Sequence, residues 1–469
     1  MPRLRKQSGF LWEEQKGMSR IKLSEHFTYG RLFRFVLPSI IMMVFVSVYG
    51  IVDGFFVSNY VGELPFAALN LIFPLIMILG SVGFMLGTGG NAVVSKALGE
   101  GDSKRAREIF SMLVYTTIVI GVALALIGIL IARPVAELFA SGEKDMTAEE
   151  RAALVEYCTM YARIIVAVLP AFMLQNAFQG FFVTAEKPRL GLYVTIAAGC
   201  TNIVLDALFV AGFSWGLAGA ALATAISQCV GGLLPLLYFA RKNDSLLRLG
   251  KCKFEGGLLV KVCINGMSEL MTNISLSVVT IVYNAQLMSL IGIKGVSAFG
   301  IMQYIGFIFV AVYLGYSVGC APIVGYHFGA QNHKELQNIS KKSILITAIF
   351  GVVMTVIACV FARPLSAIFV GYDVELLELT TEGMRVYALS YLVCGFNIFG
   401  SAFFTSLSNG GISLLISFSR TFLCQIIAVL VLPIFLGVLG VWLSLFVAES
   451  ITLVLTAALY ILEKKRYGY

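Results

Sequence analysis

Two carboxylates lie inside long apolar stretches of the sequence. Asp53 falls in an apolar run from about 33 to 58, and Asp206 follows Asn202 by four residues in a second run, 190–212. The i, i+4 spacing places Asn202 and Asp206 on one face of a helix. A carboxylate in a membrane span is costly, and it is tolerated where it faces a bundle interior or a water-filled cavity. We therefore expect these three residues to form a polar site within the membrane.

The chemistry that such a site predicts is proton or cation binding. Two neighbouring carboxylates that are removed from water do not both ionise easily, so they are expected to titrate as a coupled pair. The same oxygens are also suitable ligands for Na+. The alternative is that Asp206 only caps a helix or pairs inside the bundle, with Arg163 as a candidate partner.

A second set of polar residues lies in the apolar run 258–290. They recur every three or four residues, which forms one stripe along a helix: Asn265, Glu269, Asn273, Ser277, Thr280 and Asn284. Hydrogen bonding between helices explains the Asn and Ser residues better than it explains Glu269. A carboxylate that faces a cavity would attract cationic ligands. We expect a substrate cleft that contains Glu269, Asn273 and Asn284, together with Gln175 and Asn176 from the run 154–184.

The composition is that of a polytopic helical membrane protein. Hydrophobic residues make up 58% of the chain and charged residues 13%, against roughly 25% charged in soluble domains. There is no GxxxxGK[ST] phosphate loop, so ATP drive within this chain is not expected. The nine cysteines show no CxxC pairing, and the three histidines fall in loops or near the N-terminus. No metal centre or cofactor is therefore expected beyond a coupling ion.

Twelve apolar spans can be placed along the chain, near 33–58, 66–90, 109–132, 154–184, 190–212, 216–240, 258–290, 295–320, 341–362, 382–407, 412–436 and 438–461. Most Lys and Arg residues fall on the face that holds both termini, which the positive-inside rule assigns to the cytoplasm. The net charge of +8 therefore sets topology in the plasma membrane and does not indicate nucleic-acid binding.

The chain also repeats itself. Ala132-Arg133-Pro134 recurs as Ala362-Arg363-Pro364, and Gly216–Gly219 corresponds to Gly437–Gly440. Each half then has six spans, which gives parallel repeats around a central cleft, the build of transporters that rock one bundle against the other. The predicted units are a basic arm (1–27), an N-terminal six-helix bundle (28–240), a linker (241–257), a C-terminal bundle (258–463) and a tail (464–469).

These motifs together resemble a known family. Leu37-Pro38 with Val52-Asp53, the stretch Asn202–Asp206 and Gly266-Met-Ser-Glu269 are similar to the multidrug and toxic compound extrusion (MATE) transporters, in the bacterial branch that contains the staphylococcal multidrug exporter. The resemblance implies antiport of cationic, amphipathic compounds against H+ or Na+. It implies cation coupling at Asp53, Asn202 and Asp206 with Tyr161, and a bend of the first helix at Pro38. The acidic pair that some relatives carry on the seventh and tenth spans is not reproduced.

Three other functions compete with this interpretation. A lipid-linked oligosaccharide flippase of the same superfamily would need basic residues in the cleft to meet pyrophosphate. An integral-membrane enzyme would need a catalytic cluster at the membrane edge, and none is found in the sequence. A channel is the third alternative, and the unequal polar content of the two halves favours alternating access over it. We expect a monomeric transporter whose partners are small cationic molecules and the lipid bilayer. The sequence does not decide between H+ and Na+.

Overall fold

The computed structural model describes residues 21–141, 146–371 and 373–469, and this part of the chain is helical with no strand. The N-terminal half contains α2 (Tyr29–Tyr60), α3 (Glu63–Gly99), α4 (Ser103–Ala140), α5 (Ala148–Ala167), α6 (Leu169–Thr184), α7 (Pro188–Asp206) with the π-helical segment η1 (Ala207–Gly212), and α8 (Gly216–Ala240). The all-helical membrane fold predicted from the composition is confirmed.

The C-terminal half follows a linker of irregular structure. It contains α9 (Gly256–Ile291), α10 (Ile293–Gly329), α11 (His333–Val360), α12 (Ala362–Val370), α13 (Val374–Tyr387), the 3-10 turn η2 (Ala388–Ser390), α14 (Tyr391–Ser406), α15 (Gly410–Phe418), the π-helical segment η3 (Ser419–Leu423), α16 (Cys424–Leu436) and α17 (Val438–Tyr467). Because α17 runs to Tyr467, the basic residues that the sequence assigns to a separate tail form the last helical turn instead.

Eleven segments of the described chain are long and apolar enough to cross a membrane, and the pair α5–α6, bent by 56°, makes a twelfth. The bend falls at Val168, two residues before Pro170, which has no N–H to continue the helical ladder. The two halves share their irregularities. The fourth span of each half is broken, at Val168 and at η2, and the fifth span of each contains a π-helical segment, η1 or η3.

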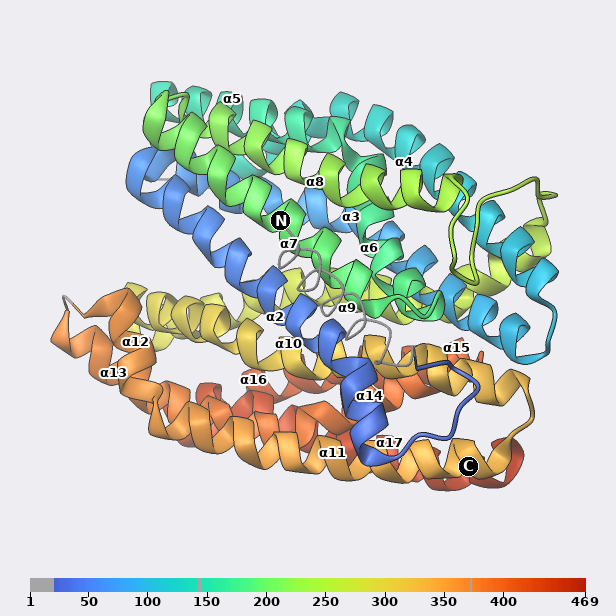
Figure 1. The fold of residues 1–469 in the computed structure, drawn as a ribbon. Helices are drawn as coiled ribbons and strands as arrows, with labels where there is room; N and C mark the ends of the chain where they lie inside the picture. The colour runs from blue at the N-terminus through green and yellow to red at the C-terminus, as the bar shows by residue number, and fades with distance from the viewer. Residues whose placement is uncertain (1–20, 142–145, 372) are drawn as a thin grey trace, which may run out of the picture.

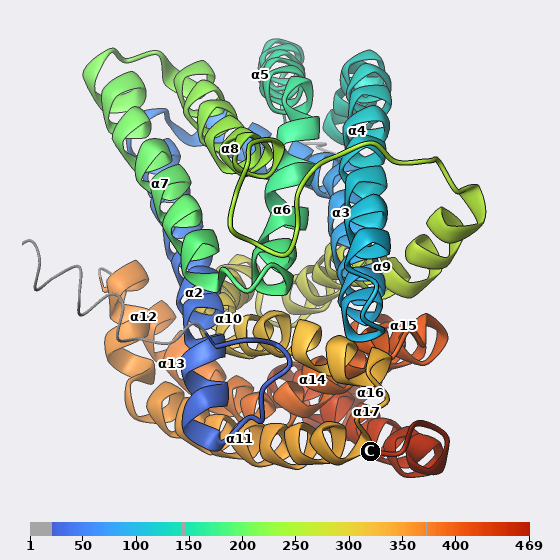
Figure 2. The ribbon, with the colours of Figure 1, turned by 45° about the vertical axis from the view of Figure 1, so that its right-hand side comes forward.

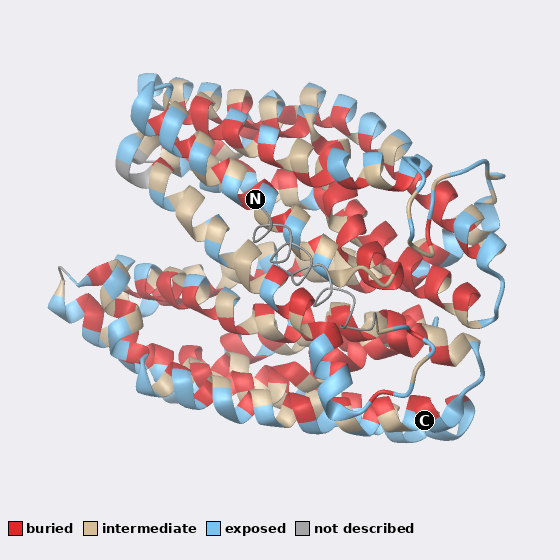
Figure 3. Ribbon diagram, in the orientation of Figure 1, coloured by how far each residue is buried: buried red, intermediate tan, exposed pale blue. Residues whose placement is uncertain are grey.

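The two halves lie side by side and diverge toward one end (Figure 1). We call the other end, which holds the linker and the described parts of both termini, the basic end. Figure 2 shows the same arrangement after rotation, with α3 to α8 above α10 to α17. Buried residues are concentrated where helices of one half face each other and where the halves meet (Figure 3).

Helix α2 joins both halves. Its first turns pack on α10 through Val36 and Ile40, and its later turns pack on α7 through Phe45 and Tyr49. Accordingly, the apolar cluster around Leu32, Phe35 and Val36 includes residues of α10, α11 and α14, whereas the rest of the N-terminal half has its own core. The helix continues through Pro38 without interruption.

Close backbone contacts hold the halves together at the basic end, and they require glycine. A Cβ atom at Gly266 of α9 would lie 2.0 Å from the carbonyl oxygen of Met85, and one at Gly89 of α3 would lie 2.1 Å from that of Val262. Nearer the helix ends, a Cβ at Gly329 would lie 2.1 Å from the carbonyl oxygen of Lys96. Small residues let helix backbones approach closely in membranes. Side chains at these positions would force the halves apart.

The predicted basic arm is partly folded onto the helices. Residues 1–20 lie outside the described part of the chain, but Ile21–Phe27 form a segment that crosses both halves, which we call the strap. The Leu23 amide donates to Glu186 Oε1 of the α6–α7 loop at 2.8 Å, and the Phe27 amide donates to Glu335 Oε1 of α11 at 2.9 Å. The strap thus links the halves at the basic end.

The linker is held against α4 by an ion pair. Arg105 Nη1 and Nη2 donate to the two carboxylate oxygens of Glu255 at 2.6 and 2.7 Å. The guanidinium beside Glu255 holds the pKa of this carboxyl below its ordinary value. This two-point contact fixes where α9 begins relative to the N-terminal half.

Candidate polar site between α2, α5, α7 and α8

Asp53 and Asp206 are brought together by the packing of α2 on α7. The two carboxyl groups lie close enough to interact directly. Asp206 is fully buried and Asp53 is half-buried. Three of the carboxylate oxygens are buried: both of Asp206, and Oδ1 of Asp53. None of the three has a hydrogen-bond donor in good geometry among the described residues. Buried oxygens of this kind are satisfied by a shared proton or by a bound cation.

Thr224 of α8 is the common neighbour of the site. Its Oγ1 accepts from Nδ2 of Asn202 at 3.4 Å, and its side chain also contacts Asp53 and Tyr161. Asn202 and Tyr161 are both buried. All four residues proposed from the sequence for cation binding therefore lie in one cluster, which also contains Thr224.

Tyr49 and Gln175 extend the cluster along α2. Tyr49 lies one helical turn before Asp53, near enough to be influenced by its charge, and contacts the Gln175 side chain from α6. The Gln175 side chain packs directly against Gly231 of α8, where a Cβ atom would lie only 2.6 Å from Gln175 Cδ. Tyr304 of α10 is also within reach of the charge of Asp53, so the site borders the C-terminal half.

The helix that carries Asp206 changes its winding directly after this residue. The π-helical segment η1 begins at Ala207. π-helical segments are rare in proteins, and those that occur are often found at functional sites. Nothing in the local sequence of η1 predicts this change.

The residues predicted for a substrate cleft do not form one group. Asn176 Nδ2 donates to the Phe172 carbonyl at 3.0 Å, and Asn273 Nδ2 donates to the Glu269 carbonyl at 2.8 Å, so both amides bond within their own helices. Asn284 is half-buried near the far end of α9. Gln175 belongs to the Asp53 cluster, on the other half. Of this set, Glu269 and Asn273 remain neighbours on the half-buried face of α9.

A charge network that the sequence did not reveal lies in the C-terminal half. Glu449 of α17 accepts from Asn397 Nδ2 at 2.7 Å and faces Arg420 Nη1 at 3.6 Å. Arg420 comes from η3 and also interacts with the carboxyl group of Glu269. These residues are far apart in the chain, which explains why no local pattern indicated this network. Glu269 and Glu449 thus share one internal cation, Arg420. Among the described residues, no basic side chain lies against Asp53 or Asp206 in this way.

Comparison with known proteins decides the family. The MatE family model matches residues 38–208 and 270–431, and the first of these ranges includes Asp53, Asn202 and Asp206 together with Tyr161. The chain belongs to the MatE family. This confirms the resemblance that the motifs predicted, and members of this family are transporters and not enzymes.

This MatE protein is similar to curated proteins over most of its length. It is 25% identical to the multidrug export protein MepA of Staphylococcus haemolyticus over 423 residues, and 23% identical to MepA of Staphylococcus aureus strain MRSA252 over 431 residues; each alignment covers 90% of both chains. Among solved structures, a MATE transporter in the straight conformation superposes with a TM-score of 0.86 at 20% identity, covering 93% of this chain and 96% of that one. An outward-facing multidrug resistance MATE transporter gives 0.84 at 20% identity, also covering 93% and 96%.

Proposed function

We propose that this MatE protein is a secondary active multidrug exporter, which exchanges cationic, amphipathic compounds for H+ or Na+ across the plasma membrane. The observation that carries the proposal is the contact between Asp53 and Asp206, in which three of the four carboxylate oxygens are buried and lack donors among the described residues. The names of the MepA relatives support multidrug export. A group whose charge changes between two access states is what coupling requires.

Cation binding at the Asp53 cluster acts on the position of α2. With both carboxylates ionised, their repulsion pushes α2 and α7 apart; a proton or Na+ between them removes the repulsion and draws the helices together. Asn202, Tyr161 and Thr224 supply neutral oxygen and nitrogen atoms that hold the cation-bound arrangement. Because α2 packs on both α10 and α7, a shift of α2 changes helix contacts in both halves.

Pro38 is the position at which α2 can bend. A proline at this position leaves the carbonyl of Arg34 without its helical partner, which weakens the ladder at that turn. In this structure the helix passes through Pro38 uninterrupted. We expect bending there in another state of the transport cycle.

The state described here is outward-facing if the basic end lies in the cytoplasm, as the positive-inside rule predicts. The strap and the glycine contacts close the basic end, and the halves diverge at the other. Export then requires opening of the basic end to load cargo. We propose that both termini are cytoplasmic and that the monomer is the working unit.

Cargo recognition is proposed to involve Glu269 on the half-buried face of α9. Its carboxyl group interacts electrostatically with Arg420, which also faces Glu449 at 3.6 Å. When both carboxylates are ionised, the two carboxylates and one guanidinium carry a net negative charge, which favours a cationic cargo. A pyrophosphate-linked cargo gains little here, because the buried cation is already engaged.

The test is transport of a fluorescent lipophilic cation such as ethidium by purified protein in proteoliposomes. Imposed pH and Na+ gradients are applied separately, and a lipophilic anion serves as the comparison cargo. Ethidium movement against its own gradient with one of the two ion gradients supports antiport and identifies the coupling ion. Failure of both ion gradients to drive ethidium would exclude antiport of this cargo.

A further inference from the structure

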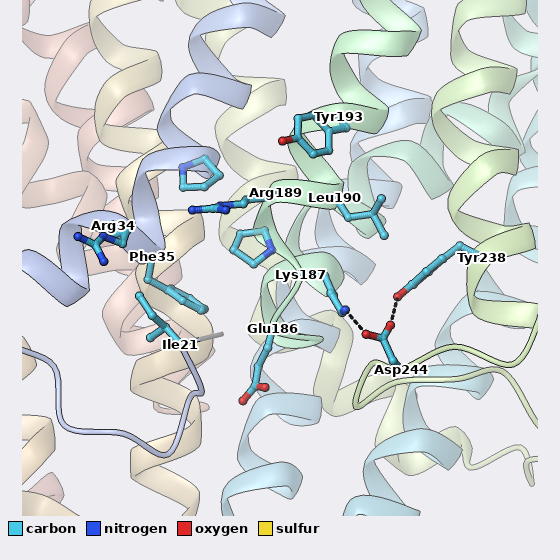
Figure 4. A pocket seen from close by; sticks show the side chains of 12 residues that line it. Ile21, Arg34, Phe35, Glu186, Lys187, Arg189, Leu190, Tyr193, Tyr238 and Asp244 are labelled. Atoms are coloured by element: carbon cyan, nitrogen blue, oxygen red, sulfur yellow. Dashed lines mark hydrogen bonds and ion pairs between the residues drawn. The ribbon is translucent and has the colours of Figure 1, made fainter. Parts of the chain in front are cut away.

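A cavity of about 450 Å³ opens at the basic end, between the first turns of α2 and the start of α7 (Figure 4). None of the residues of the Asp53 cluster lines it, and Pro38 is the one lining residue to which the proposed transport mechanism gives a role. Its size is within the range of small-ligand sites. Its walls come from α2, the α6–α7 loop, α7, the end of α8, the linker and the strap residue Ile21.

One side of the cavity is the part of α2 that packs on the C-terminal half, and the other side is the start of α7. Arg34 and Phe35 lie on the part of α2 that packs with α10. Arg189 lies on the first turn of α7, in the N-terminal half, and extends from α7 toward α2 in Figure 4. A ligand that binds both arginines therefore spans the boundary between the halves.

The charges of the cavity favour an anion. Its two acidic groups have partners: Asp244 Oδ2 accepts from Lys187 Nζ at 2.5 Å, and Glu186 Oε1 accepts from the Leu23 amide at 2.8 Å. Arg34 makes no hydrogen bond or ion pair with the described residues. The three lining cations exceed the two acids, and guanidinium groups bind phosphate by two parallel hydrogen bonds.

The remaining wall suits an acyl chain. Pro38, Leu190 and Tyr193 line it, and the Tyr193 side chain is 63% exposed on the outer surface of α7. Arg34 is the sixth residue of α2, about 8 Å along the helix from its first residue, and Arg189 is the second residue of α7. Basic groups this close to the ends of membrane spans lie at the level of lipid headgroups, and basic pockets between helices on the cytoplasmic side bind anionic headgroups.

We propose that this cavity binds the headgroup of an anionic phospholipid from the cytoplasmic leaflet, with its phosphate between Arg34 and Arg189 and an acyl chain along Leu190 and Tyr193. This lipid ties the first turns of α2 to α7 and so stabilises the state in which the basic end is closed. The assignment of the leaflet rests on the proposed orientation. A ligand that binds one of two states shifts the equilibrium toward it.

Binding is tested by native mass spectrometry of the full chain, released from nanodiscs of phosphatidylglycerol and phosphatidylcholine. Arg34→Gln and Arg189→Gln are compared with Arg241→Gln, which removes one positive charge at the end of α8 outside the cavity. We expect wild type and Arg241→Gln to retain phosphatidylglycerol over phosphatidylcholine, and each cavity variant to lose about tenfold in retention, as for one charge-assisted contact. Thermal unfolding of each variant confirms that it is folded, and Arg34→Lys should restore part of the retention.

A second readout is hydrogen–deuterium exchange of the strap, whose Leu23 and Phe27 amides are bonded to opposite halves. Phosphatidylglycerol should slow their exchange in wild type and in Arg241→Gln, but not in Arg34→Gln. Equal retention of phosphatidylcholine, or unchanged retention in both cavity variants, would overturn the proposal. Displacement of the lipid by millimolar inorganic phosphate would make this a site for free anions instead. Neither readout measures transport. If the proposed antiport fails its own test, these experiments therefore still decide whether the cavity binds lipid.

Discussion

The two halves treat their buried carboxylates differently. Glu449 and Glu269 have Arg420 as a fixed internal cation, whereas Asp53 and Asp206 have hydroxyl and amide neighbours. A fixed cation lowers the cost of an ionised carboxylate inside the membrane. A pair without one must bind a proton or a metal ion to be stable there. We therefore propose that ion coupling takes place in the N-terminal half and cargo recognition in the C-terminal half.

Thr224→Val should weaken cation coupling without disturbing the fold. The substitution keeps the shape of the side chain and removes the hydroxyl that Asn202, Asp53 and Tyr161 share. The loss of one hydrogen bond at a charged group corresponds to about tenfold in affinity. The ion concentration that gives half-maximal efflux should rise by that order, and Thr224→Ser should behave as wild type. An unchanged ion dependence in Thr224→Val would remove this residue from the site.

Glu269→Gln should reduce export of cationic compounds more than export of neutral ones. The change leaves Arg420 with only Glu449 as a partner and removes the net negative charge of the network. Initial efflux rates for a cationic and a neutral dye of similar size give the comparison. Equal losses for both dyes would return Glu269 to a role in packing.

At the scale of the residue, the sequence predicted that Asp53, Asn202 and Asp206 lie together, but not that Thr224 joins them. Asp53 and Asp206 were recognisable because a carboxylate in an apolar run is expensive. Thr224 and Arg420 were not, since a threonine in a membrane helix is common and the partners of Arg420 are distant in sequence. Amides such as Asn176 and Asn273 were assigned to a cleft, yet they donate to carbonyls of their own helices.

At the scale of the element, α2 and the glycine contacts of α3 and α9 determine which end is closed. The positions of the helices followed from hydropathy, because each must span the bilayer. The π-helical segments and the strap could not be predicted from hydropathy, because both depend on contacts between distant segments. The sequence assigned Ile21–Phe27 to a basic arm, but Leu23 and Phe27 are completely buried in the structure.

Gly266→Ala should open the basic end. The added methyl group would meet the Met85 carbonyl at 2.0 Å, which backbone atoms cannot accommodate without moving α9 away from α3. Amide exchange in the facing turns of α3 and α9 should become faster, and outward-facing molecules should become fewer. Gly257→Ala is the matched control on the same helix, because a Cβ there meets nothing within 4 Å. Equal exchange in the two variants would show that the close approach does not hold this end.

At the scale of the whole molecule, we propose that the two-half architecture and the charge distribution determine the direction of transport. Reporter domains fused after Thr147 and after Ser245 should report opposite sides of the membrane, with Ser245 in the cytoplasm. The reason is the excess of Lys and Arg at the basic end. The same side for both positions would contradict the twelve-span topology, and an extracytoplasmic Ser245 would reverse the proposed direction of transport.

The central claim is that Asp53 couples the ion gradient to export, and Asp53→Asn tests it most directly. The neutral amide keeps the size of the side chain and costs less in the membrane, so the variant should insert and should still bind drug in detergent. In proteoliposomes with an imposed H+ or Na+ gradient, we predict that wild type drives ethidium against its own concentration gradient and that Asp53→Asn does not. Gradient-driven efflux by Asp53→Asn at the wild-type rate would contradict the account.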